Sequence, residues 1–160
     1  MLGVTVVCVG KLGEKFYADA CNEYGKRLGA FCKLSVVEIA EERLSQNPSV
    51  GEITAALSTE AKRILAAIDQ KSLIVPLCVE GEELSSEKFA AKIDGWANAG
   101  RSRLTFIIGG SFGLADEIKR LGSFKLSMSK MTLPHHLARV FLLEQLYRAF
   151  SINSGGKYHK

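Results

Sequence analysis

Short apolar runs alternate with segments of helical periodicity along the whole chain. The apolar runs occupy 2–9, 33–39, 73–79, 103–108 and 124–126, and the helical segments occupy 16–31, 49–68, 85–97, 115–120 and 134–150. Two of the runs, 73–79 and 103–108, are almost continuously apolar, as strands buried on both faces are. The alternation predicts an α/β fold with a mostly parallel sheet that helices cover on both faces.

Length and composition fit a single domain over 1–160. The chain has 160 residues and is 47% hydrophobic, which is enough for one substantial core. It has no repeat, low-complexity segment or linker, and only 151–160 look irregular. No apolar run approaches the roughly 20 residues that a bilayer span needs. The first residues have the pattern of a strand and lack a leader's cleavage site, so no membrane partner is expected.

The four cysteines are scattered and form no C-x-x-C pair. Their spacing disfavours a zinc site, and a domain with an ample core rarely depends on disulfides. We expect Cys8 and Cys78, which stand in apolar strands, to be buried thiols. The cysteines therefore favour a reducing, cytoplasmic compartment, and no metal is expected.

The net charge is +4, which by itself says little about partners. Its distribution is more informative, because basic residues gather near both ends of the chain, and the segment 38–52 between them is more acidic, with Glu38, Glu41, Glu42 and Glu52. If the two ends meet in space, they form a basic face that suits RNA. An ordinary solvated surface explains the charges equally well.

A glycine-rich loop, Gly109 to Gly113, follows the strand at 103–108. Glycines let the backbone approach a ligand closely, and ligands of parallel sheets bind beyond the carboxyl ends of strands. The loop matches G-x-S-x-G, the nucleophile elbow of serine hydrolases, with Ser111 as nucleophile and Asp116 and a histidine following. Asp116 is too close to Ser111 in the chain to orient a histidine across a site. A tight turn beside a ligand is therefore favoured over a hydrolase.

Three further features fill the last third of the chain. The loop 127–136 carries two methionines and backbone donors that could surround an adenine and a thioether, or it is a connector with both methionines in the core. The helix 134–150 is apolar over so wide an arc that it is either central or shared with a second subunit. The ending Tyr158-His159-Lys160 is either frayed or able to stack a base, move a proton and hold a phosphate.

The chain resembles the SPOUT class of RNA methyltransferases, and within it the family that methylates N3 of a pseudouridine in large-subunit ribosomal RNA. The resemblance runs from end to end, through VGK (9–11), EYGKRL (23–28), LSSEKFA (84–90), FIIGGSFGL (106–114), LSMSKMTLPHHLARVFLLEQLYRAF (126–150) and YHK (158–160). It implies an α/β domain with a C-terminal trefoil knot, a homodimer, S-adenosylmethionine as cofactor, and ribosomal RNA in the assembled ribosome as substrate. By motif, the cofactor contacts fall on Leu77, Gly109, Met128, Ser129, Lys130, Met131, Thr132 and Leu133.

The implied reaction is attack of the pseudouridine N3 on the sulfonium methyl group. The imide proton must leave before or during attack, and no metal is required. The hypothesis assigns His159 as base or base-positioner, Tyr158 to the nucleobase, and Arg139 to the uracil oxygens or a phosphate. The family often has a proline before Tyr-His, where this chain has Lys157 after Gly155-Gly156, which makes the tail more flexible. A methyltransferase with another RNA target and a non-catalytic ribosome-binding protein are the alternatives.

Overall fold

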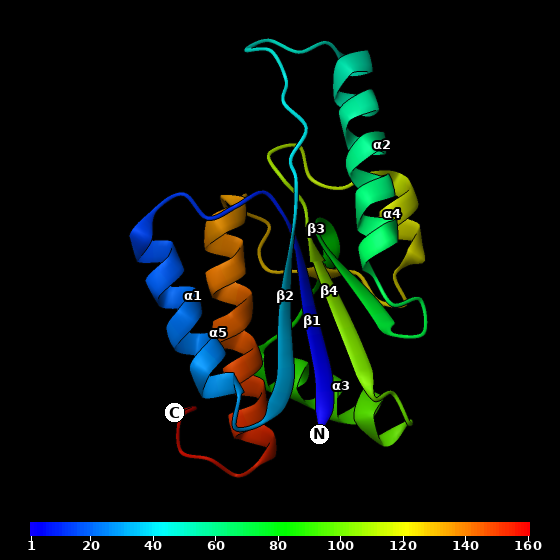
Figure 1. Cartoon of the computed structure of the whole chain (residues 1–160). Coiled ribbons are helices and arrows are strands. Elements are labelled where there is room, and N and C mark those ends of the chain that lie inside the picture. The colour runs from blue at the N-terminus through cyan, green and yellow to red at the C-terminus, as the bar shows by residue number, and fades with distance from the viewer.

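Strands and helices alternate along the chain as the pattern predicts (Figure 1). The computed structural model describes all 160 residues. Its elements are β1 (Leu2–Val9), α1 (Lys15–Leu28), β2 (Cys32–Ile39), α2 (Val50–Ala67), β3 (Leu73–Glu83), α3 (Ser86–Asn98), β4 (Arg103–Ile108), α4 (Asp116–Leu121), β5 (Leu126–Ser127) and α5 (His135–Asn153).

The five strands form one parallel sheet in the order β2-β1-β4-β3-β5. Val6 in the middle of β1 pairs with Val36 on one side and Phe106 on the other. Because all strands run the same way, the loops that follow them gather at one edge of the sheet. This is the edge where parallel sheets bind ligands.

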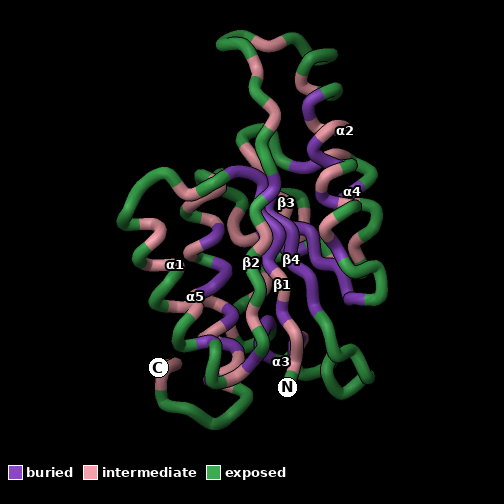
Figure 2. The backbone as a smooth tube through the Cα atoms, in the orientation of Figure 1, coloured by how far each residue is buried: buried purple, intermediate pink, exposed green.

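Helices cover both faces of the sheet, which confirms the predicted α/β fold (Figure 1). Alternate residues of β1 serve two cores: Val4 and Val6 pack into a core with α1, α3 and α5, and Val7 and Val9 pack into a core with α2 and α4. The strands and the inner faces of the helices are accordingly the most buried parts of the chain (Figure 2).

The second core is the smaller one, and α2 extends beyond it with the loop 40–49 (Figure 1). Ser49 caps this helix: its hydroxyl accepts the N–H of Glu52, whose carboxylate in turn accepts the N–H of Ser49. This reciprocal cap stabilises a helix start that has little tertiary support.

The first helix differs from the predicted one at its apolar face. It ends at Leu28, and Gly29 follows, as the helical pattern that ends near Gly29 predicts. Phe16, which the helical pattern places on the buried side, is 65% exposed. The apolar periodicity is correct for Leu28 and fails at the first turn, which extends past the core.

The last helix is longer than predicted, since 151–153 continue it and only 154–160 are irregular. Two glycines end it. Gly155 has φ of 73°, its N–H donates to Ile152 O, and the N–H of Gly156 donates to Ser151 O. This pattern of helix termination reverses the chain direction, so the tail turns back beside α5.

Strand β3 is also longer than predicted and reaches Glu83 instead of Val79. A bulge after Leu77 shifts its register, so that Leu77 and Glu82 both pair with Leu126. Gly81 allows β3 and β5 to approach closely at this point, because a Cβ there would lie 2.7 Å from the backbone carbon of Leu126. The bulge fixes β5 and thereby the start of the loop 128–134.

Strand order and pairing establish the sheet but leave the trefoil knot a prediction. None of the helices combines the length and the apolar character that crossing a bilayer requires.

Candidate functional site

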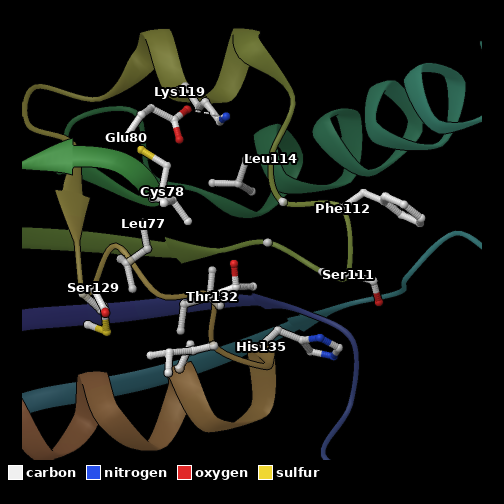
Figure 3. A pocket seen from close by; sticks show the side chains of 18 of the residues that line it. Leu77, Cys78, Glu80, Ser111, Phe112, Leu114, Lys119, Ser129, Thr132 and His135 are labelled. Atoms are coloured by element: carbon white, nitrogen blue, oxygen red, sulfur yellow. Dashed lines mark hydrogen bonds and ion pairs between the residues drawn. The ribbon is translucent and has the colours of Figure 1, made fainter. Parts of the chain in front are cut away.

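A cavity of ≈ 400 Å³ lies beyond the carboxyl ends of β4 and β5 and beside the second half of β3 (Figure 3). Its volume falls in the range of about 300–1,000 Å³ that is usual for small-molecule sites. Seven of the eight predicted cofactor residues line it: Leu77, Gly109, Met128, Ser129, Met131, Thr132 and Leu133. The eighth, Lys130, is exposed and is not part of the lining. The structure thus brings together one residue of β3 and residues of the two loops that follow β4 and β5.

The glycine loop forms one wall of the cavity as a tight turn. Gly110 and Gly113 pair across it, and Gly113 has φ of 79°. A side chain at Gly109 would collide with the backbone of Gly113. Both glycines are therefore required by the turn, which leaves the cavity wall made of backbone.

The opposite wall is the loop after β5, and most of its backbone groups are free. Within 129–133, only the N–H of Met131, which donates to Ser129 Oγ at 2.9 Å, and the carbonyl of Ser129, which accepts from Ser127 Oγ at 3.1 Å, have hydrogen bonds in the chain. Free backbone donors and acceptors beside the apolar side chains of Leu77 and Leu133 suit the edge of an adenine ring and its ribose. The cavity therefore fits S-adenosylmethionine.

An ion pair stands at one side of the cavity. Lys119 from α4 and Glu80 from β3 both line it, with Nζ 2.5 Å from Oε1. The hydrogen bond from Lys119 is the main cause that lowers the pKa of Glu80. A charged pair here can meet the polar amino-acid end of a cofactor.

Glu41 and His135 complete the site; His135 belongs to the motif 126–150, whereas no sequence motif includes Glu41. Glu41 Oε1 accepts hydrogen bonds from the backbone N–H and the hydroxyl of Ser111, each at 3.2 Å. His135 lines the cavity, and burial lowers its pKa, with neighbouring His136 acting in the same direction. Both residues meet over Gly10, where a Cβ would lie 3.4 Å from Glu41 Oε2 and from His135 Nε2.

The same contacts exclude the serine-hydrolase interpretation. Ser111 donates its hydroxyl to a carboxylate and has no histidine partner. A nucleophile elbow also strains the serine backbone, whereas no residue other than glycine has positive φ in this chain. Ser111 instead holds the glycine loop to Glu41 through these two hydrogen bonds.

The tail residues Tyr158 and His159 lie at the far end of α5 from the cavity. His135 begins this helix, and Arg148 stands 13 residues later, which corresponds to about 20 Å along the axis. Tyr158 Oη donates to Glu144 Oε1 at 3.2 Å, and its ring packs on Tyr147 and beneath the Arg148 guanidinium. Within one chain, the predicted catalytic tail and the cofactor cavity are separate.

His159 is held between two charged partners. Arg148 Nη1 lies 3.2 Å from Nδ1, and Glu87 Oε1 lies 2.8 Å from Nε2. Since the guanidinium can only donate, Nδ1 must accept, and Nε2–H then donates to Glu87. In this arrangement Arg148 covers the Nδ1 lone pair. Tyr158 beside it has its pKa raised to about 12, mainly by burial.

Arg139 is only 4% exposed and lies beneath the loop after β1. It donates to Glu38 Oε2 at 3.0 Å and to Gly10 O at 3.1 Å, while its Nε has no partner. In the single chain, the guanidinium supports the backbone at Gly10 and does not reach open solvent. A direct contact with substrate stays a prediction.

The contacts of Glu80 and Glu41 show which signals were available in the sequence. Glu80 follows a buried strand, so its place at the binding edge can be deduced from the sheet. Glu41 also follows a strand, but its partner Ser111 is 70 residues away, and no spacing connects them. Cys78, expected to be buried, lies partly open in the cavity lining, whereas Cys8 is buried as expected.

Comparison with known proteins gives an independent measure of these relationships. The family model described as predicted SPOUT methyltransferase matches residues 2–159. The chain is 44% identical over 159 residues to the ribosomal RNA large subunit methyltransferase H of Clostridium acetobutylicum, and 43% identical over 159 residues to that of Lactobacillus helveticus. Each alignment covers 99% of this chain and 100% of the relative.

A solved structure shares the fold. The probable methylase family protein from Haemophilus influenzae superimposes with a TM-score of 0.59 at 16% identity, over 100% of this chain and 72% of that one. Together with the full-length family match, this shows that the chain belongs to the SPOUT methyltransferase family.

Proposed function

We propose that this protein transfers a methyl group from S-adenosylmethionine to N3 of a pseudouridine in large-subunit ribosomal RNA. The observation that carries the proposal is the cavity beside β3 and the ends of β4 and β5, which gathers seven residues of the cofactor motif. Family membership supports methyl transfer, and the names of the full-length relatives support the ribosomal RNA substrate.

The walls of the cavity determine how a cofactor would be held. The glycine loop around Gly109 and the loop 128–133 offer backbone groups to the adenosine, and Leu77 and Leu133 offer apolar contact. S-adenosylmethionine supplies an electrophilic methyl group on a sulfonium. Since that positive charge disappears during transfer, apolar walls that exclude water favour the reaction.

The nucleophile is a nitrogen that must lose a proton. The N3 of a neutral pseudouridine is an imide N–H and becomes reactive only when a base takes its proton. His159 is the proposed base or base-positioner, and Tyr158 is the proposed contact to the nucleobase. For His159 to accept a proton at Nδ1, Arg148 must first release that atom.

A homodimer would bring this tail to a cavity. Leu137 and Phe141 are each 37% exposed on α5, four residues apart and hence on one face of the helix. Two copies that pack antiparallel along this face place the carboxyl end of each α5 beside the amino end of the other. Each tail then lies near its partner's cavity, across the distance that separates the two within one chain.

The assembled ribosome is the proposed substrate, and the cytoplasm the proposed compartment. One small domain has little surface with which to select an RNA site. A dimer doubles that surface, and the ribosome presents the target nucleotide in a fixed shape. Arg139 is the proposed contact to the uracil oxygens or a phosphate, and within one chain it supports the loop at Gly10.

Methylation of ribosomes tests the proposal. Purified protein and radiolabelled S-adenosylmethionine are incubated with ribosomes that contain or lack the pseudouridine, and the modified nucleoside is identified by mass spectrometry. We expect transfer only where pseudouridine is present. Equal transfer to ribosomes with uridine alone would point to another RNA target, and no cofactor binding at millimolar concentration would contradict the enzyme.

A further inference from the structure

Four aromatic rings form a continuous row that begins at the cavity. His135, which lines it, packs against His136 with centroids 4.1 Å apart. The ring of His136 meets Tyr17 at 5.8 Å, and Tyr17 meets Phe16 at 4.5 Å. The row crosses from the first turn of α5 to the first turn of α1, which begin at the same end of the molecule (Figure 1).

The outer end of the row is open and apolar. Phe16 is 65% exposed, although its neighbours along α1 pack against α5. An aromatic side chain so exposed contributes little to the core. It lies at the outer end of a row of rings that leads to the cavity, where a ligand with a flat apolar face can stack on it.

The charged side chains around Phe16 include one lysine that has no ion-pair partner. Lys11 is exposed and has no ion-pair partner, and Lys15 is exposed beside Phe16 with Asp19 at 2.7 Å. Glu14 opposes them, but its carboxylate lies 3.4 Å from His136 Nδ1. Lysines next to an exposed ring are the combination by which proteins bind single-stranded nucleic acid: stacking on the bases and attraction to the phosphates.

The segment from Gly10 to Lys15, which leads to Phe16, is held at its first residue by Arg139. Gly10 turns the chain after β1 with φ of 96°, and the buried guanidinium of Arg139 holds its carbonyl at 3.1 Å. The loop from Gly10 to Lys15 therefore has a rigid base at the cavity rim. A rigid ring binds a base at lower entropic cost than a mobile one.

We propose that the row from Phe16 to His135 is a stacking platform for an unpaired nucleotide that flanks the target in the RNA. Phe16 stacks on the base, and Lys11 and Lys15 contact the phosphates. The platform rests on the proposed function, since it assumes an RNA substrate, and it adds a binding surface outside the cofactor cavity. Phe16 is a positioning residue and does not touch the reacting atoms.

Steady-state methylation of ribosomes separates this role from a structural one. Phe16→Ala raises the KM for ribosomes about five- to fifty-fold, as expected when one base–aromatic stack is lost, with little change in kcat. Phe16→Trp restores the KM, because indole stacks at least as well. The matched control is Val50→Ala, which removes an apolar side chain that is 81% exposed on α2, remote from the cavity. An unchanged KM in Phe16→Ala overturns the platform.

Direct binding tests the platform without turnover. Anisotropy of a fluorescein-labelled single-stranded oligouridylate at low salt gives its affinity for each variant. We expect weaker binding for Phe16→Ala and for Lys11→Ala, and no change for Lys33→Ala, a lysine at the opposite edge of the sheet. Equal binding by all variants overturns the platform, whatever the ribosome assay shows.

Two further measurements assign the row to another role if the proposal is wrong. Light scattering of Phe16→Ala that shows a monomer where the parent is a dimer makes the row a subunit interface. A loss of S-adenosylmethionine affinity in that variant assigns the row to the cofactor site. If the parent binds the oligonucleotide through Phe16 yet methylates no ribosome, the platform stands and the proposed reaction fails.

Discussion

Arg139 and Glu38 lie 101 residues apart in the chain, yet Arg139 Nη1 is 3.0 Å from Glu38 Oε2. The pair joins α5 to the end of β2, and a second bond to Gly10 O joins it to the turn after β1. One buried side chain thus connects the last helix to the two strands that begin the fold.

Loss of this guanidinium should be costly for folding. Arg139→Met leaves Glu38 and the Gly10 carbonyl without a donor, so we expect the free energy of unfolding in urea to fall by about 2–4 kcal/mol. Asp19→Asn, which breaks the exposed pair with Lys15, serves as control and should change it by less than about 0.5 kcal/mol. A near-neutral Arg139→Met would show that the buried ion pair contributes no net stability.

Gly109 should tolerate no side chain. Gly109→Ala places a Cβ against the backbone of Gly113, so the glycine loop must move and the affinity for S-adenosylmethionine should fall at least about ten-fold. Calorimetry measures the affinity. Gly95→Ala is the control: a Cβ there meets nothing within 4 Å, and we expect a gain of about 0.5–1 kcal/mol from helix propensity with unchanged binding.

His159 should matter for turnover and not for the cofactor. We expect His159→Ala to abolish methyl transfer while leaving the affinity for S-adenosylmethionine nearly unchanged, since its proposed partner is the RNA base and the residues of the cofactor motif line the cavity without it. Single-turnover assays on ribosomes and calorimetry give the two quantities. Full activity in this variant would refute the proton-transfer role.

Phe141 should be essential to the dimer. Phe141→Arg puts a charge in the centre of the proposed α5 interface, and we expect a monomer by light scattering at micromolar concentration, with methyl transfer lost. Leu121→Arg changes a side chain that is 43% exposed on α4, on the opposite face, and should leave the assembly intact. A parent protein that is itself monomeric would contradict the dimer.

Glu60 should give stability a particular pH dependence. Burial raises the pKa of this carboxyl above its ordinary value of 4.5, so the folded state binds its proton more tightly than the unfolded state does. Stability from this group is therefore highest below pH 4.5 and is lost as pH rises through the folded-state pKa. Glu60→Gln keeps an acceptor for the Glu42 N–H and should stabilise the protein at pH 7. The gain should vanish at acid pH, and a gain that does not depend on pH would have another cause.

The sheet could be predicted because its central strands are apolar at nearly every position. A run such as Leu104 to Ile108 is apolar at nearly every position, and only a strand covered on both sides explains it. Helical periodicity was equally informative for Ile64 and Leu146, which are buried. The same periodicity failed at Phe16, because the spacing of apolar residues does not distinguish a side chain that packs in the core from one that is exposed.

The cofactor residues could be predicted only by resemblance to a family, and their neighbours could not. A motif identifies Met128 to Leu133 as a unit, whereas Glu41 contacts Ser111 across 70 residues of sequence. Likewise, nothing in the ending Tyr-His-Lys indicates that His159 meets Glu87, 72 residues earlier. Such contacts depend on where the chain returns in space, which local pattern does not record.

The two glycines after α5 determine the direction of the C-terminal tail. Gly155 adopts a left-handed conformation that turns the last residues back along their own helix. Glycine is almost equally stable in extended conformations, so the same chain can continue straight ahead instead. The dihedral angles of Gly155 therefore set the direction of the tail, and in the proposed dimer they set how each tail lies toward the partner's cavity.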